Sequence, residues 1–153
     1  MKISKKSSSL SVFKSTFLKG IRPQNKKCFN VNNKTGIKIL TKLRVEFSDL
    51  RAHRFRHNFN CLSPTCRCEL EDESNTHYLT VCDIFSEQRI ILFSSVSSLI
   101  PNFNSLSNEE ITQYLLYGNK SLKDDVNMKI LTETISFITA TKRFDKLEAF
   151  DET

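Results

Sequence analysis

Three cysteines and one histidine near the middle of the chain have the types and spacing of a metal site. Cys66, Cys68, His77 and Cys82 follow the pattern C-x-C-x8-H-x4-C. Thiolate sulfur and imidazole nitrogen are the ligands that Zn²⁺ binds in closed structural sites. A short polar segment buries little apolar surface, so a bound metal can supply its folding energy. The sequence therefore predicts a zinc ion as a structural cofactor of this segment.

Other uses of the cysteines stay open at the level of sequence. Most of them lie within residues 61–82, whereas a secreted disulfide framework usually spreads an even set over the whole chain. Reduced cysteines packed as small hydrophobes are the alternative without a metal. Cys61 is a competing ligand, since it precedes Cys66 by five residues and repeats every fourth residue with His53 and His57. We rank that second set lower because nothing closes it into a site.

The first part of the chain is strongly basic. Residues 1–57 carry fifteen Lys or Arg against two acidic residues, and residues 58–153 carry eight against fifteen. Such an asymmetry favours an anionic partner for the basic part, and nucleic acid is the commonest. Residues 51–57, RAHRFRH, also interleave basic with aromatic groups, which suits phosphates and stacked bases. The alternative is a solvated basic face, or one that docks on the chain's own acidic part.

The sequence carries no set of residues typical of an enzyme. Metal-dependent polymerases gather carboxylates from separate elements, whereas Asp124 and Asp125 stand together at an expected helix start, where capping explains them. Gly20, Gly36 and Gly118 lie far apart, so no Gly-rich phosphate loop exists. A cysteine nucleophile would lack an orienting group and an oxyanion turn. We therefore expect no intrinsic catalysis.

Helices are predicted to position these residues. The chain of 153 residues has only three glycines and three prolines, which disfavours a turn-rich β architecture. Apolar residues recur at helical spacing in several stretches. The expected helices span residues 10–21, 36–47, 49–57, 84–99, 107–117 and 121–144. The predicted fold is mostly α: a small helical domain with a Cys3His zinc-finger-like loop inserted between helices.

Some helix ends can be predicted from the sequence. Ser107 and Glu110 form a capping box for a helix that Gly118 ends. Ser121 with Asp124 is expected to begin the last helix. Each pair places a hydroxyl three residues before a carboxylate, which is the spacing that a helix start requires.

The basic helices need a break between them. In one straight helix Arg44, Arg51 and Arg54 would fall on the apolar face that includes Phe47. We expect a break near Phe47 and Ser48, with Ser48 capping the second helix. Alternatively, the arginine stems extend along the apolar surface and keep their charged ends in water.

Composition divides the chain into five stretches. They are a basic amphipathic segment (1–22), basic helices (23–60), a zinc-finger-like module (61–83), C-terminal helices (84–146) and an acidic tail (147–153). No apolar run approaches the ~20 residues of a membrane-spanning helix, and the Lys/Ser-rich start lacks the apolar core of a secretory signal. We therefore expect an intracellular protein, nuclear or cytoplasmic, with no membrane partner.

Three stretches, in order, carry a likeness to a known family. They are the basic segment at 40–59 (LTKLRVEFSDLRAHRFRHNF), the Cys/His array at 66–82, and the stretches 115–118 and 130–144. Together they resemble the C-terminal region that follows the polymerase domain in non-LTR (LINE-type) retrotransposon reverse transcriptases. The likeness covers about residues 21–144, and the ordered succession is more specific than any one motif.

The resemblance implies a Cys3His zinc module with basic helices that contact RNA and/or DNA beside a reverse transcriptase domain. Carried over to this chain, the zinc ligands are Cys66, Cys68, His77 and Cys82. The corresponding nucleic-acid contacts are Lys42, Arg44, Arg51, His53, Arg54, Arg56 and His57. Two positions depart from the family: Glu69 and Asp83 stand where glycine and proline are usual. Glu69 would strain a turn that needs a positive φ, whereas Asp83 merely lets a helix continue.

Three hypotheses for function follow. The polymerase and endonuclease are missing, so the chain resembles a truncated fragment of such an element. The leading hypothesis is a zinc-stabilised, nucleic-acid-binding accessory module without catalysis. A second is a structural scaffold that packs on an upstream polymerase domain, and a third is a degenerate remnant with no present function.

Overall fold

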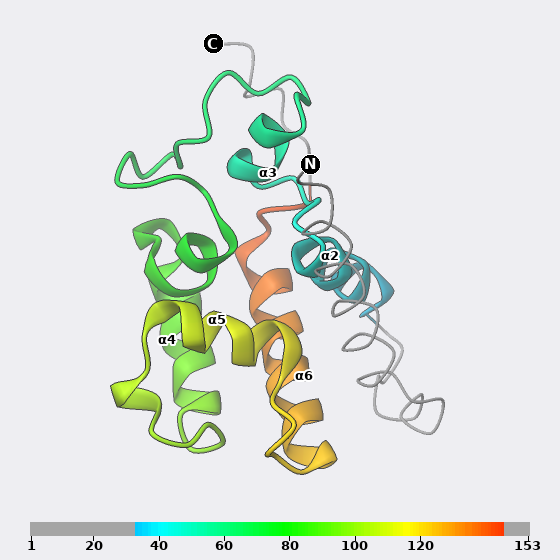
Figure 1. The fold of residues 1–153 in the computed structure, drawn as a ribbon, viewed down its shortest axis with the longest axis vertical. Helices are drawn as coiled ribbons and strands as arrows, with labels where there is room; N and C mark the ends of the chain where they lie inside the picture. The colour runs from blue at the N-terminus through cyan, green and yellow to red at the C-terminus, as the bar shows by residue number, and fades with distance from the viewer. Residues whose placement is uncertain (1–32, 146–153) are drawn as a thin grey trace, which may run out of the picture. The chain divides into compact units, whose positions relative to one another are not determined.

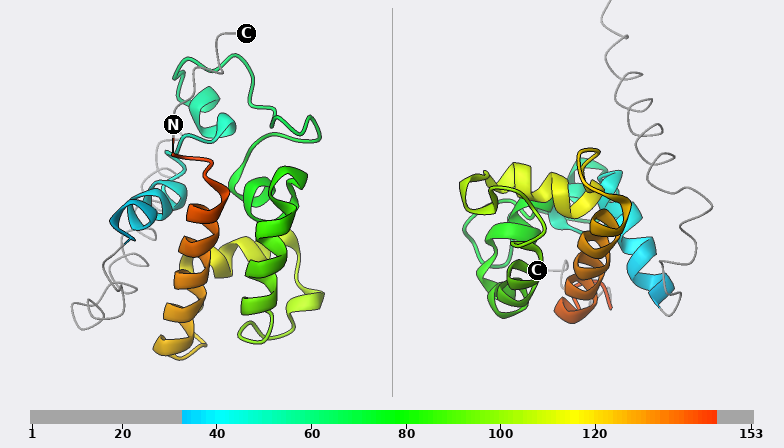
Figure 2. Two further views of the ribbon diagram at one scale, coloured as in Figure 1. Left: turned by 180° about the vertical axis from the view of Figure 1, so that it is seen from behind. Right: turned by 90° about the horizontal axis from the view of Figure 1, so that it is seen from below.

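The helices pack around one long helix near the carboxyl end of the chain. The computed structural model describes residues 33–145, and Figure 1 shows their arrangement. Helix α6 (Asp124–Thr141) contacts α2 (Lys34–Arg44), α4 (Ser86–Val96) and α5 (Asn108–Tyr117). Figure 2 shows α4 and α6 side by side, with α5 crossing them. Each of the other long helices of the described part, α2, α4 and α5, therefore packs against α6.

Short elements fill the connections. Helix α3 (Arg51–Arg56) follows α2. The cysteine-bearing loop is followed by a π-helical turn, η3 (His77–Val81). Two 3-10 turns come later, η4 (Asp83–Phe85) and η5 (Phe103–Ser105). Residues 33–145 contain no strand, only one isolated bridge. The mostly helical fold, with the Cys/His cluster between helices, is confirmed.

Apolar burial explains why these helices pack together. On α6, Ile130, Phe137 and Ile138 are at most 3% exposed. Leu92 of α4 and Leu115 of α5 are at most 2% exposed. Full burial of one such side chain stabilises the fold by about 1.5–3 kcal/mol before the entropy of ordering is subtracted. The spacing of the apolar residues along α6 thus predicts its position at the centre of the helices.

Helix α2 approaches α6 unusually closely at Gly36. A Cβ atom at Gly36 would lie 2.6 Å from Cγ2 of Ile135, a distance that real Cβ atoms do not adopt. Asn33 caps α2 there, since its side-chain oxygen accepts from Gly36 N at 2.9 Å and its amide donates to Thr139 of α6 at 2.7 Å. The helix accordingly begins at Lys34, earlier than the sequence pattern indicated.

The predicted helix ends were right for α5 and wrong for α6. Ser107 and Glu110 form the capping box of α5, and Gly118 ends that helix with a φ of +67°. Ser121, however, does not cap α6, because its hydroxyl and backbone N–H both bond to Asn119. Helix α6 begins at Asp124 without a side-chain cap.

Two further helix predictions need correction, and one cannot be placed. Helix α4 spans Ser86–Val96, shorter than the expected 84–99, because a 3-10 turn precedes it. The break after α2 is present, but α3 begins at Arg51 and Ser48 does not cap it. Instead, the Ser48 hydroxyl accepts from Leu50 N at 3.2 Å. The helix expected at 10–21 and the acidic tail lie outside the described residues.

Candidate metal centre

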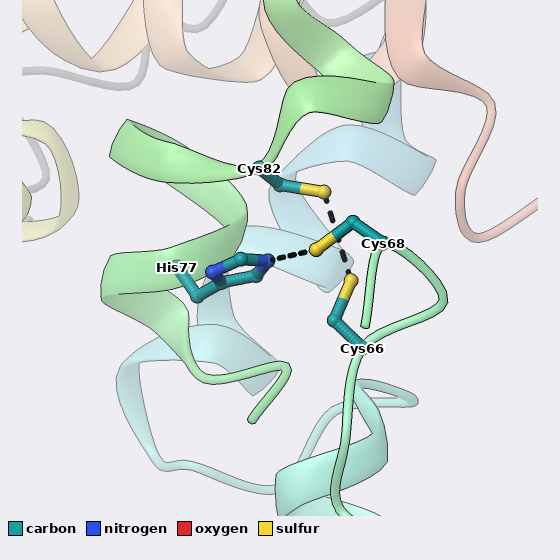
Figure 3. Close-up of side chains that lie close together, drawn as sticks. All are labelled: Cys66, Cys68, His77 and Cys82. Carbon is teal, nitrogen blue, oxygen red and sulfur yellow. Dashed lines mark hydrogen bonds between the residues drawn. The ribbon is translucent and has the colours of Figure 1, made fainter. Parts of the chain in front are cut away.

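Cys66 and Cys68 stand on a tight turn closed by backbone hydrogen bonds. An antiparallel bridge joins Thr65 and Asp72, which brings the two sides of the turn together. Within it, Glu69 N donates to Cys66 O at 2.9 Å. This geometry lets the Cys66 and Cys68 sulfurs face the same space (Figure 3).

Glu69 carries the strain that the sequence predicted for this turn. Its φ is +64°, in the left-handed region that glycine adopts without cost. A residue with a Cβ atom costs roughly 1–2 kcal/mol in that region. The turn therefore keeps the backbone that a glycine would favour, with a glutamate in its place.

The other two ligands stand on a π-helical turn. Cys82 N donates to His77 O at 2.8 Å, which is a hydrogen bond across five residues. This turn directs both His77 and Cys82 toward the cysteine turn (Figure 3), while Tyr78 and Leu79 are completely buried. The wide turn suits the spacing of these two ligands, and such turns are frequent at functional sites.

The four ligand atoms lie close enough together to share one metal ion. All are within 4.8 Å of one another. The Cys66 and Cys82 sulfurs are 3.6 Å apart, and Cys68 Sγ lies 3.1 Å from His77 Nε2 (Figure 3). Around tetrahedral Zn²⁺ a sulfur pair would be about 3.8 Å apart and a sulfur–nitrogen pair about 3.5 Å apart. The residues fit a four-coordinate ion with small adjustments, so the predicted set forms a candidate metal site.

Groups around this set would orient and balance the ligands. His77 is 1% exposed, and its second ring nitrogen, Nδ1, faces Glu71 Oε2 at 3.4 Å. This is a contact without a hydrogen bond, because Nδ1 is buried and has no hydrogen-bond partner among the described residues. Near Cys82, Arg89 donates to Val81 O at 3.2 Å, and its Nη1 atom is buried without a hydrogen-bond partner among the described residues. Arg89 thus places a positive charge beside the thiol group of Cys82.

Burial makes thiolates unfavourable here unless a cation compensates them. Burial raises the pKa of the Cys66 thiol to about 12, and its hydrogen bonds with the neighbouring thiols add to the effect. Burial also raises the pKa of Cys82. A metal ion deprotonates coordinating thiols outright, because its charge stabilises the thiolate. The site is therefore suited to a divalent cation and poorly suited to free thiolates.

A buried ion pair connects this centre with the end of α6. Glu73, in the acidic loop at 69–73, is only 3% exposed. Its carboxylate accepts two hydrogen bonds from Arg143, at 2.6 and 2.7 Å, and one from Arg51 N at 2.8 Å. Although burial lowers the pKa of Arg143, its bonds to Glu73 outweigh that effect and raise it. Glu73 is therefore an anchor of the loop.

Two of the predicted nucleic-acid contacts, Arg44 and His53, have buried side chains in this structure. Arg44 is 9% exposed and donates to Leu116 O at 2.5 Å, so it joins α2 to α5. His53 is 2% exposed, and its Nδ1 lies 2.8 Å from the Ser48 hydroxyl. Burial lowers the pKa of His53 to about 4, so the ring is neutral at pH 7. Sequence spacing could not separate these two from surface residues.

The remaining predicted contacts reach the surface to different degrees. Lys42, Arg51 and Arg54 are half-buried, whereas Arg56 and His57 are exposed. Arg56 pairs with Glu46 at 2.7 Å. These five side chains stay candidates for a nucleic-acid surface.

Exposed rings lie among them. The ring cluster, Phe47, His57 and Phe59, has ring centroids 4.8 to 6.2 Å apart. Both phenylalanines are 48% exposed, although Phe47 was expected on the buried face of its helix. It is turned outward because α2 ends at Arg44, before Phe47 is reached.

The competing ligand set does not assemble. The Cys61 thiol donates to Ser63 O at 3.1 Å and is not among the four clustered ligands. His53 bonds to Ser48, and His57 Nε2 lies 3.3 Å from Glu46 O. Each member of this second set therefore contacts a different group, and the three do not form one site.

The chain matches no protein-family model, no curated protein and no solved structure. Within residues 33–145, no helix combines the length and the hydrophobicity needed to span a bilayer.

The sequence did not predict Arg89, the Glu73–Arg143 pair or the exposure of Phe47. The only signal for the pair was one acidic and one basic residue seventy positions apart. Function must therefore be inferred from the ligand set and the surface beside it.

Proposed function

We propose that this chain is a zinc-stabilised module that binds nucleic acid and has no catalysis of its own. Three sulfurs and one imidazole nitrogen favour zinc over the hard cations that prefer oxygen. Four protein ligands leave no open position for a reacting water, which is typical of structural zinc. The resemblance to the C-terminal region of non-LTR reverse transcriptases agrees with both parts of the proposal.

The ring cluster is the observation that carries nucleic-acid binding. Phe47, His57 and Phe59 expose their rings together, close in sequence to the basic residues of α3. Bases of a single strand stack on such rings, each contributing about 1–3 kcal/mol, with little dependence on sequence. Arg56, the last residue of α3, directly precedes His57 and can approach the phosphates. We therefore expect a preference for single-stranded RNA or DNA over a duplex.

Titration of the full chain with labelled oligonucleotides tests this proposal. Single-stranded RNA, single-stranded DNA and a DNA duplex are compared at several salt concentrations. Binding to the single strands should weaken linearly in log Kd against log salt, since phosphate contacts release counterions. No binding to any of the three at low salt would refute the proposal.

A matched pair of variants isolates the stacking rings. Phe59→Ala should weaken binding to single strands by about 5- to 100-fold, from the loss of one stacked base. Leu62→Ala serves as control, because Leu62 is 76% exposed, also apolar and outside the ring cluster. Equal effects of the two substitutions would contradict stacking.

A second candidate function is a scaffold for an upstream polymerase domain. Ile90 and Ile91 of α4 are 67% and 68% exposed, and Ile84 just before the helix is 51% exposed. Adjacent exposed isoleucines of this kind often mark a protein contact. The partner is the reverse transcriptase domain that the resemblance implies.

Substitutions on α4 separate the two functions. Ile90→Ser with Ile91→Ser should weaken association with a separately expressed polymerase domain and leave RNA affinity unchanged. Arg54→Gln with Arg56→Gln should weaken RNA binding and leave association with the polymerase domain unchanged, if the basic side chains contact nucleic acid. A loss of polymerase association with unchanged RNA affinity in the arginine variant would favour the scaffold.

A further inference from the structure

A cleft with a cationic lining lies beside the metal centre. It has a volume of about 410 Å³ and includes Cys66, one of the metal ligands, in its wall. We call it the cationic cleft. Its charged lining residues come from three regions, and they are Arg54, Arg67, Lys142, Arg143, Glu73 and Asp145.

The two most buried charges of this lining, on Glu73 and Arg143, neutralise each other. Glu73 and Arg143 form the ion pair described above, with side chains only 4% and 19% exposed. The other charged lining residues are Arg54, Arg67, Lys142 and Asp145. Arg67 and Lys142 are exposed, and Arg54 is half-buried. The formal charges of all the lining side chains thus sum to a positive value, with four basic residues and two acidic ones.

Folding of the loop onto α6 assembles this charge. Arg67 stands between the ligands Cys66 and Cys68, whereas Lys142 follows the last residue of α6 in a left-handed conformation, with φ of +52°. The Glu73–Arg143 pair joins these two regions. A short sequence motif could not have revealed a set spread from residue 54 to residue 145.

We propose that the cationic cleft binds a phosphodiester group of a nucleic-acid strand. This inference rests on the proposed function and assigns part of its binding surface. Arginine recognises phosphate oxygens through a planar fork of donors, and lysine adds a point charge. The volume lies within the range of about 300–1,000 Å³ that small-ligand sites occupy, enough for one nucleotide unit.

The cleft is connected to the ring cluster through Arg54. Phe59 N donates to Arg54 O at 2.9 Å, so the backbones of a ring-cluster residue and of a cleft arginine are hydrogen-bonded. In this proposal a single strand places a phosphate in the cleft and a base on the rings. A compact anion without bases would use the cleft alone.

Salt-dependent RNA binding by the zinc-loaded full chain tests the cleft. The cleft variant, Arg67→Gln with Lys142→Gln, is compared with Lys120→Gln plus Lys129→Gln, two exposed lysines outside the cleft. With a labelled single-stranded RNA, the cleft variant should bind at least about tenfold more weakly. Its slope of log affinity against log salt should become shallower by about 0.7 for each phosphate that the protein no longer neutralises. The control should keep the wild-type slope.

Each outcome decides between named alternatives. If wild type binds RNA and the cleft variant keeps both affinity and slope, the cleft proposal is wrong while the proposed function stands. If wild type binds no nucleic acid at all, the proposed function itself fails. Displacement of RNA by an oligoglutamate of equal charge and length, at equal concentration, would assign the cleft to acidic peptides instead.

A further variant guards against misfolding. Arg67 lies between two metal ligands, so its substitution could disturb the metal content. Lys142→Gln alone avoids this problem, because Lys142 follows α6. A reduced slope with wild-type metal content supports the cleft, and an unchanged slope overturns it.

Discussion

The finger, residues 61–82, and the helices α4 to α6 are ordered by different forces. In the helices, Leu92, Leu115 and Ile130 are at most 2% exposed. They belong to α4, α5 and α6, and α6 packs against the other two. The part of the finger before η3 instead exposes its large apolar residues, with Leu62 at 76% and Leu70 at 61%. Before η3, it buries Cys66 and the charged Glu73.

This difference shows where the stability of each region comes from. The helices gain free energy from apolar burial, which needs no ligand. The loop before η3 has little apolar burial, so the buried Glu73–Arg143 pair and, in our proposal, metal coordination stabilise it. The two regions meet at Tyr78, whose hydroxyl lies 2.7 Å from Thr141 and whose ring contacts that of Phe137. The comparison can be tested by perturbing each force separately.

Removal of the metal should have the largest effect. Structural zinc supplies roughly 10 kcal/mol or more of local folding free energy, so a chelator should unfold the finger. Backbone amides at 65–73 should lose their hydrogen-exchange protection, whereas those of α5 and α6 should keep most of theirs. Measurement of exchange with and without chelator checks this. A uniform loss across all helices would show that the two regions are not separable.

Breaking the buried ion pair should have the next largest effect. Glu73→Ala leaves Arg143 buried without its partner, which costs about 3–5 kcal/mol in comparable pairs. The free energy of unfolding, measured by denaturant titration, reports the loss. The matched control is Glu46→Ala, which breaks a pair with Arg56 whose side chains are 57% and 56% exposed. An exposed pair contributes about 1 kcal/mol or less, so similar losses would contradict the role of Glu73.

Acid should destabilise the protein through His53. Burial lowers its pKa to about 4, below the usual value near 6.5. The unfolded chain therefore binds an extra proton between these values, so His53 contributes its full stability above about pH 6.5 and loses it as the pH falls to 4. The loss approaches about 3 kcal/mol.

A variant without this titration isolates the effect. His53→Gln should lower stability at neutral pH and flatten the dependence of unfolding free energy on pH in that window. The metal ligands titrate equally in both proteins, so the difference between the two curves belongs to His53. Parallel curves would contradict the assignment.

Relief of the strained turn should have the smallest effect. Glu69→Gly removes the Cβ atom at a φ of +64° and should stabilise the protein by about 1 kcal/mol. Thermal unfolding of the zinc-loaded protein measures the gain. Glu69→Ala is the control, because it removes the carboxylate but keeps the strained Cβ atom. A gain with alanine equal to that with glycine would show that charge, not strain, limits the turn.

Local features of the sequence predicted the parts that depend on local physics. Ser107 and Glu110 gave the start of α5 because a capping box needs only neighbouring residues. The ligand set was likewise readable from spacing within one short segment, whereas the strain at Glu69 was expected from the resemblance, in which glycine is usual at that position. Residues at 1–22 and 147–153 lie outside the described part, so predictions there stay predictions.

The burial of Arg44 and of Glu73 depends on contacts between distant segments, whereas the missed cap at Ser121 has a local cause. Arg44 is buried because a carbonyl of α5, seventy-two residues away, accepts its hydrogen bond. Glu73 is buried because Arg143 reaches it from the end of α6. Ser121 was taken for a cap, yet Asn119 competes for its hydroxyl. Hydrophobic periodicity carries no information about which polar residue finds a distant partner.

Metal analysis of the purified full chain tests the central claim most directly. Wild type and Cys61→Ser should each contain about one zinc ion per chain, since Cys61 lies outside the four-ligand set. Cys68→Ser should lose most of its zinc. Absence of zinc from wild type, or zinc retained by Cys68→Ser and lost by Cys61→Ser, would contradict the Cys3His site.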